Sequence, residues 1–186
     1  MAQTDSSAPA RKPRRANVQI DRLDELAGTD LADLCEITAE AIIDGEGFLW
    51  IKVPPLRVLE NYWKGVLLVP ERSLYVGRLD GRIVGTAQLY HPSHNNEAGA
   101  FAVELTTFFI APWARGHGVA RGILKRLFRE ARQRGYKNID LHVRADRSAA
   151  IALFEAHGFE CWGEKPRYAR LKGRYIGGRY YTKQLG

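Results

Sequence analysis

The 186-residue sequence lacks the features that mark membrane-spanning, secreted and metal-binding proteins. It has no apolar run near the roughly eighteen residues that a transmembrane helix needs. Its polar N-terminus has no apolar segment of the secretory type, so we expect a cytoplasmic protein. The two cysteines, Cys35 and Cys161, have no metal-like spacing. We therefore expect buried free thiols and no bound metal.

Signatures of nucleic-acid recognition are also missing, although the formal net charge is +7. We find no aromatic and basic strand motif of the RNA-binding kind, and no internal repeats. Residues 1–16 hold four Arg or Lys residues and one Asp, which gives +3 of this charge. Because this segment has few apolar residues, we expect a disordered basic tail. A basic surface can instead attract a polyphosphate, so nucleic-acid binding is not expected as the primary function.

Hydrophobic periodicity predicts a mixed α/β domain over residues 17–186. Strands are expected at residues 18–23, 74–79, 83–90, 101–110, 138–143, 168–171 and 179–183. Helices are expected to begin at Thr29 or Asp30, near Pro55, near Gly118, and at Asp146 or Ser148. Asp80-Gly81 predicts a hairpin, and Gly135 and Gly158 are expected to end the last two helices.

Residues 104–134 combine an apolar strand, a glycine-rich turn and a basic amphipathic helix. The turn is Arg115-Gly116-His117-Gly118-Val119-Ala120. Its small residues allow several backbone N–H groups to converge at a helix N-terminus, where the helix dipole favours an anion. A strand before the turn and a helix after it are the context of a phosphate or pyrophosphate site, although glycines also mark ordinary tight turns.

The R-x-x-G-x-A form of this turn, which follows a strand ending in an apolar-Pro step, resembles the acyl-CoA-binding signature of the GNAT superfamily of N-acetyltransferases. Residues 142–159, which include VRADRSAAIALFEAHGF, resemble the family's second cofactor-contacting segment. Together with the strand, these blocks span about a third of the chain. The resemblance implies a mostly antiparallel sheet that splays between two adjacent parallel strands, 101–110 and 138–143, with the cofactor in that cleft.

The resemblance also implies how acetyl-CoA would be held. Amides of residues 116–121 would cradle the pyrophosphate, and backbone groups of Phe108 and Ile110 would run beside the pantetheine as an added strand does. His117 and Arg121 could add charge toward the phosphates or belong to a solvated basic face. The expected cofactor-binding residues are Phe108, Phe109, Ile110, Arg115, Gly116, His117, Gly118, Val119, Ala120, Arg121, Ala149 and Phe154.

Glu104 is the expected general base. It is the one ionisable residue in the stretch AFAVELTTFFIAP, and alternation predicts that it shares a face with Thr106, Phe108 and Ile110. It lies eleven residues before Arg115, where several GNAT members similarly carry a catalytic Glu. An apolar cleft would raise its pKa and suit it to accept a proton. The alternative is a Glu that pairs with an Arg or is exposed.

The general acid is less defined by the resemblance. Many GNAT members carry a Tyr where this sequence has Phe154, and commonly an Asn where Arg147 stands. Tyr168 is the candidate catalytic tyrosine, although solvent could protonate the sulfur. Three further tyrosines of the C-terminal hairpin are also candidates: Tyr175, Tyr180 and Tyr181. Any of these side chains could instead pack the hairpin.

The acceptor amine is expected to bind the 44–63 segment and the C-terminal hairpin. Asp44 and Glu46 could attract a cation, and Trp50 and Tyr62 could form an apolar wall, or all four could be ordinary surface and packing residues. The sequence thus predicts an acetyl-CoA-dependent N-acetyltransferase that works by direct attack in a ternary complex. Its acceptor would be a small cationic amine, of aminoglycoside or polyamine type, or a protein amine. A homodimer is compatible with the family. The alternative is a non-catalytic acyl-CoA-binding or sensing domain.

Overall fold

The computed structural model describes residues 16–45 and 50–186. The predicted basic tail up to residue 15, and Glu46, lie outside the described residues. The strands are β1 (Val18–Leu23), β2 (Arg72–Leu79), β3 (Arg82–Tyr90), β4 (Ala102–Ile110), β5 (Asn138–Arg144), β6 (Glu160–Leu171) and β7 (Arg174–Gln184). The helices are α1 (Asp30–Ile43), α2 (Leu56–Leu68), α3 (Val119–Gln133) and α4 (Ser148–Ala156), with a 3-10 turn, η1 (Pro112–Ala114). No helix among these residues is long and apolar enough to cross a membrane.

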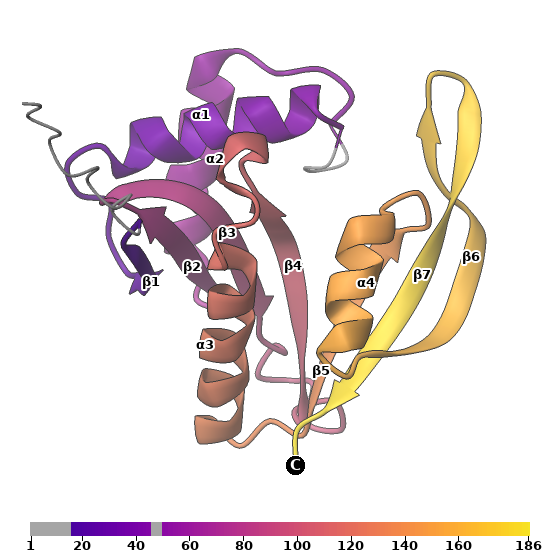
Figure 1. Cartoon of the computed structure of the whole chain (residues 1–186). Coiled ribbons are helices and arrows are strands. Elements are labelled where there is room, and N and C mark those ends of the chain that lie inside the picture. The colour runs from indigo at the N-terminus through magenta and orange to yellow at the C-terminus, as the bar shows by residue number, and fades with distance from the viewer. Residues whose placement is uncertain (1–15, 46–49) are drawn as a thin grey trace, which may run out of the picture.

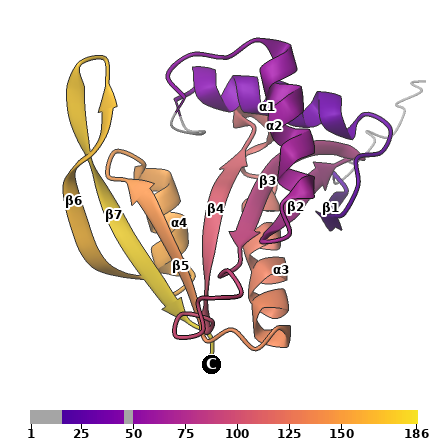
Figure 2. The same cartoon turned by 180° about the vertical axis from the view of Figure 1, so that it is seen from behind.

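The seven strands form one mixed sheet in the order β1-β2-β3-β4-β5-β7-β6. All neighbouring strands are antiparallel except β4 and β5, which are parallel. Helices α3 and α4 lie on one face of the sheet (Figure 1), and α2 lies on the opposite face (Figure 2). The predicted mixed α/β fold and its order of elements are confirmed.

Helix α3 packs on the sheet through the apolar stripe that its sequence predicts. Its buried side chains include Ile123, Leu124 and Leu127, each fully enclosed. Burying each such side chain contributes about 1.5–3 kcal/mol. Arg121 and Lys125 are exposed on the other side of the helix. The stripe therefore fixes which way the N-terminus of α3 faces, and with it the glycine-rich turn.

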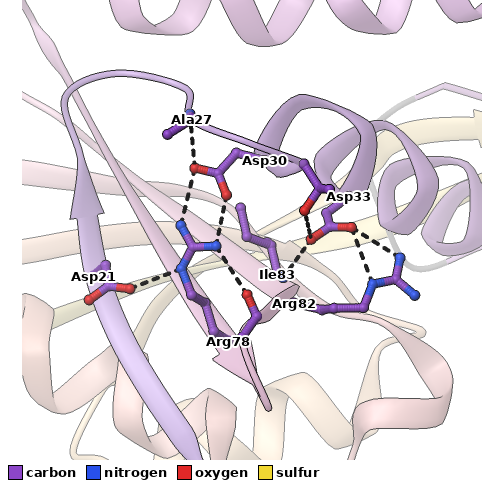
Figure 3. Close-up of polar contacts among 9 residues, drawn as sticks. Asp21, Ala27, Asp30, Asp33, Arg78, Arg82 and Ile83 are labelled. Atoms are coloured by element: carbon purple, nitrogen blue, oxygen red, sulfur yellow. Dashed lines mark hydrogen bonds and ion pairs between the residues drawn. The ribbon is translucent and has the colours of Figure 1, made fainter.

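Helix α1 is held to the β2–β3 hairpin by buried carboxylates (Figure 3). Asp30 accepts two hydrogen bonds from the Arg78 guanidinium, at 2.7 and 3.1 Å. Asp33 accepts one bond from the backbone N–H of Ile83 at 3.0 Å and another from Arg82 at 3.0 Å. The two carboxylates are only 4% and 3% exposed, so these partners replace the water that the charges lose.

The C-terminal hairpin differs from the prediction. Its strands are much longer than residues 168–171 and 179–183, and the turn between them is Lys172-Gly173 alone. The prediction missed the part of β6 before residue 168 because two register shifts, at 161–163 and 165–169, interrupt its alternation. The expectation that Cys161 is buried is also wrong, because β6 is an edge strand and leaves this thiol exposed, whereas Cys35 is buried.

Candidate active site

Strands β4 and β5 part after three paired residues. The pairs are Ala102 with Asn138, Val103 with Ile139, and Glu104 with Asp140. Beyond Glu104 the two strands diverge, as Figures 1 and 2 both show. The edge of β4 that faces β5 is therefore left without a partner strand along its second half, which leaves backbone groups free to bind an extended amide-containing ligand.

A glycine-rich turn lies at the open end of this cleft. Gly116 and Gly118 have φ of 81° and 83°, a conformation that disfavours side chains, and Gly118 is the residue before the first turn of α3. A cavity of about 340 Å³ opens here. Of the predicted cofactor residues, seven line it: Ile110, Arg115, Gly116, Gly118, Val119, Ala120 and Arg121. A helix N-terminus beside two arginines suits a phosphate group.

A β-bulge in β4 turns its second half toward this cavity. Thr107 has φ of 52°, and the β3–β4 register shifts between Thr86 and Gln88. Because of the extra residue, Phe108 packs on Phe154 of α4 with ring centroids 5.4 Å apart. The prediction that Phe108 and Ile110 share a face with Glu104 is therefore wrong. Glu104 thus lies on the face opposite α3 and α4, whereas Ile110, after the bulge, lines this cavity.

Glu104 forms one end of a line of three side chains. Its Oε1 lies 3.1 Å from Nε2 of His142 on β5, and the other ring nitrogen of His142, Nδ1, lies 2.5 Å from the hydroxyl of Tyr168 on β6. An ionised carboxylate can only accept, so a neutral His142 ring carries its proton on Nε2 and accepts a hydrogen bond from the Tyr168 hydroxyl at Nδ1. Glu104 and His142 are 40% and 39% exposed, so Glu104 is not in the apolar setting that we expected.

Two features of the hairpin aim Tyr168 at His142. The β6–β7 register shifts between Lys165 and Ala169, which lifts Tyr168 out of the ladder. Opposite it, Gly178 leaves room for the ring, since a Cβ there would lie 2.3 Å from Cγ of Tyr168. Burial raises the pKa of the Tyr168 hydroxyl, and electrostatic interaction with Tyr180 and Glu104 adds to the rise. Tyr168 therefore keeps its proton at neutral pH.

Comparison with known proteins agrees with this geometry. Residues 36–159 match the model of the acetyltransferase (GNAT) family. The chain is 51% identical over 128 residues to an uncharacterised N-acetyltransferase from the hisH–hisA intergenic region of Azospirillum brasilense, which covers 69% of this chain and 76% of that protein. The chain belongs to the GNAT acetyltransferase family.

Two further relatives share parts of this GNAT domain. N-alpha-acetyltransferase RimI of Mycobacterium tuberculosis is 35% identical over 107 residues, which is 57% of this chain and 64% of that protein. The structure of yncA of Salmonella typhimurium, which contains its cofactor acetyl-CoA, superposes with a TM-score of 0.73 at 20% identity. That match covers 91% of this chain and 94% of yncA and shows that the fold is shared.

Several predicted site residues of the GNAT domain lie outside the donor cavity. Phe109 and Phe154 are 5% and 4% exposed and belong to the core. Ala149 is exposed in the first turn of α4. His117 directs Nδ1 toward the carbonyl oxygens of Ala114 and Arg115, both at 3.1 Å, and so braces the turn rather than facing the cavity.

The described residues predicted to bind the acceptor lie away from the cavity beside Glu104. Asp44 accepts a bond of 2.7 Å from Arg115 and so borders the donor turn. Trp50 packs edge-on against Tyr62 at 5.7 Å, and the Tyr62 hydroxyl accepts a bond from Gln88. None of these three residues lines a second, larger cavity, which contains Glu104 in its wall.

That cavity, of about 710 Å³, lies beside Glu104. Tyr181 bonds to Glu155 of α4, so its neighbour in β7, Tyr180, points to the opposite face, where it helps to line the cavity. His142 also lines it, and this residue was missed as a functional candidate. Its place opposite Tyr180 depends on the β5–β7 register, which no local sequence pattern reveals.

Proposed function

We propose that this GNAT protein is an acetyl-CoA-dependent N-acetyltransferase in which Glu104 is the general base and Tyr168 the general acid. The observation that supports this most is the hydrogen-bonded line from Glu104 through His142 to Tyr168. It lies where β4 and β5 part, and two of its members, Glu104 and His142, line the larger cavity. Glu104 therefore borders the space that we assign to the amine, and Tyr168 is connected to it through His142.

The residues around the smaller cavity fit acetyl-CoA. A Cβ at Gly116 or Gly118 would project into open space, so the turn presents backbone there instead of side chains. The lining includes Arg115 and Arg121 and no carboxylate. This combination matches a pyrophosphate, while the unpaired edge of β4 matches the amides of pantetheine. Acetyl-CoA, when bound, would supply a thioester carbonyl and a thiolate leaving group.

The side chains then divide the proton transfers between them. Glu104 accepts a proton from the amine, whose nitrogen forms a bond to the carbonyl carbon as the carbon–sulfur bond breaks. Tyr168 donates its hydroxyl proton to the departing sulfur. His142 holds the carboxylate and the phenol in their relative positions through its two ring nitrogens. Phe154 has no proton to give, so Tyr168 takes the place of the tyrosine expected at that position.

For the acceptor, we propose a primary amine, either a small cationic amine or a protein amine. The similarity to an N-alpha-acetyltransferase supports a protein N-terminus. A cavity of about 710 Å³ beside Glu104 supports a small molecule. A non-catalytic acyl-CoA-binding domain is the second candidate, favoured by the loss of the usual tyrosine at Phe154.

Thermal unfolding with and without acetyl-CoA, followed by thiol release over a panel of amines and peptides, tests these alternatives. A ligand that binds only the folded state raises the unfolding midpoint by mass action. A raised midpoint together with thiol release is the expected result. A raised midpoint without release from any amine or peptide would favour the non-catalytic domain. An unchanged midpoint would contradict the donor site.

A further inference from the structure

The cavity beside Glu104 has a charge opposite to that of the molecule. The formal net charge of the chain is +7, yet the described residues that line this cavity include Glu104 and Asp140 and no Lys or Arg. A hollow lined by one sign of charge concentrates the field of those charges and attracts ligands of the opposite sign. The cavity is therefore selective for cations in a protein that otherwise repels them.

Asp140 is the unexplained member of this pair. It is half-buried on β5, directly beside Glu104 in the parallel register, and it makes no hydrogen bond or ion pair with any described residue. A half-buried charge without a partner is unfavourable in the free protein and becomes favourable when a cationic ligand supplies the partner.

The two carboxylates have different tasks during the reaction. Glu104 accepts the proton of the reacting amine, so the positive charge of that nitrogen is consumed. Asp140 takes no part in the proton transfer, so it can bind a cation that persists after acetylation. Adjacent strands lie about 4.8 Å apart, so the two charges are within reach of one short molecule. Trp162 and Tyr180, with ring centroids 5.4 Å apart, form an aromatic wall suited to methylene groups and cations.

On the basis of the acetyltransferase activity proposed above, we infer that the acceptor is a diamine or polyamine. One nitrogen reacts beside Glu104, and a second, cationic nitrogen binds the Asp140 carboxylate. Asp140 is thus a residue that determines specificity, while the aromatic wall excludes water from the chain between the nitrogens.

Steady-state thiol release with 1,4-diaminobutane and 1-aminobutane tests the inference, because the two probes differ only in the second ammonium. We expect kcat/KM to be about tenfold higher for the diamine, which is the usual value of a hydrogen bond to a charged group. In Asp140→Asn this preference should fall to near one, mainly through a higher KM for the diamine. Glu97→Gln removes one negative charge from the adjacent loop without touching the cavity lining and should keep the preference.

The outcomes separate this inference from the activity itself. Equal kcat/KM for the two probes, or an unchanged preference in a folded Asp140→Asn variant, would overturn the inference and leave the acetyltransferase activity standing. Thiol release with peptides alone would do the same. Acetyl-CoA binding without thiol release from any amine or peptide would contradict the activity.

Discussion

At the scale of single residues, His142 connects the proposed general base, Glu104, to the proposed general acid, Tyr168. Its ring bonds to Glu104 through Nε2 and to Tyr168 through Nδ1, and it is flanked by the rings of Tyr168 and Tyr180 at 5.4 and 5.8 Å. Removing the two nitrogens while keeping a ring would therefore disconnect the base from the acid without emptying the space between the tyrosines. His142 acts through its neighbours and is a positioning residue.

His142→Phe should lower kcat about tenfold or more, because a hydrogen bond to a charged group contributes about 1.5–3 kcal/mol. Steady-state kinetics across pH should show that kcat changes less with pH, on both the acidic and the alkaline side, because Glu104 and Tyr168 are no longer held in fixed positions relative to each other. Affinity for acetyl-CoA should be unchanged in a binding titration. His94→Phe, in the exposed 91–101 loop, is the control. An unchanged kcat and pH profile in a folded His142→Phe protein would show that the line has no role.

At the scale of elements, the turn before α3 carries the proposed acetyl-CoA site. Gly118→Glu should abolish acetyl-CoA binding, because it places a side chain and a negative charge where the pyrophosphate belongs. Gly135→Glu is a matched control: Gly135 follows the same helix at its other end, has the same φ of 83°, and has no atom within 4 Å of its Cβ position. Both variants carry the same backbone strain.

Isothermal titration with acetyl-CoA, after circular dichroism has shown that both variants are folded, measures the difference. Gly135→Glu should bind as the wild type does. Normal affinity in a folded Gly118→Glu protein would refute the assignment of the turn to the phosphates.

Features that depend on residues close together in the sequence could be predicted. Features that depend on how distant strands pair could not. The glycine turn, the apolar stripe of α3 and Glu104 each depend on a few neighbouring residues. The neighbours of Asp140 and His142 are set by the register of β5 with β4 and β7, so the sequence around these two residues does not reveal them. The bulge at Thr107 reversed the predicted face of Phe108 because one extra residue inverts a period of two. The sequence offered four tyrosines of the hairpin as candidates. Only the register shift in β6 and the space at Gly178 show that Tyr168 is directed toward His142.

At the scale of the whole molecule, one sheet parts between β4 and β5, and buried charges attach α1 to that sheet. The α1 helix depends on Asp30 and Asp33 for its attachment to the β2–β3 hairpin. Edge strands β1 and β6 remain available for pairing between copies, so a homodimer stays a prediction. The expected extent of the domain, residues 17–186, also stays a prediction.

Acid should destabilise the protein through Asp30. Burial acts to raise the pKa of this carboxyl, but hydrogen bonds from Arg78 and the Ala27 N–H, with the Arg78 charge, outweigh it and lower the pKa. The folded pKa is below the unfolded one, so the stabilisation is present above about pH 4 and is lost as the pH falls through the folded value. Urea unfolding across pH should show this loss.

The free energy of unfolding of Asp30→Asn should be about 2–3 kcal/mol lower than that of the wild type at pH 7, since the substitution leaves Arg78 without its buried partner. As the pH is lowered, the free energy of unfolding should fall less in the variant than in the wild type. Asp24→Asn, whose carboxylate is 76% exposed, is the control and should change little. Equal acid sensitivity in Asp30→Asn and the wild type would contradict the role of this ion pair.

The measurement that tests the central claim most directly is the pH dependence of thiol release for Glu104→Gln against the wild type. If Glu104 is the general base, the variant should be about 100-fold slower near pH 7. The deficit should shrink as rising pH deprotonates the amine, while acetyl-CoA affinity stays the same. An unchanged rate at pH 7, or a deficit that is constant with pH, would remove Glu104 from the proton transfer.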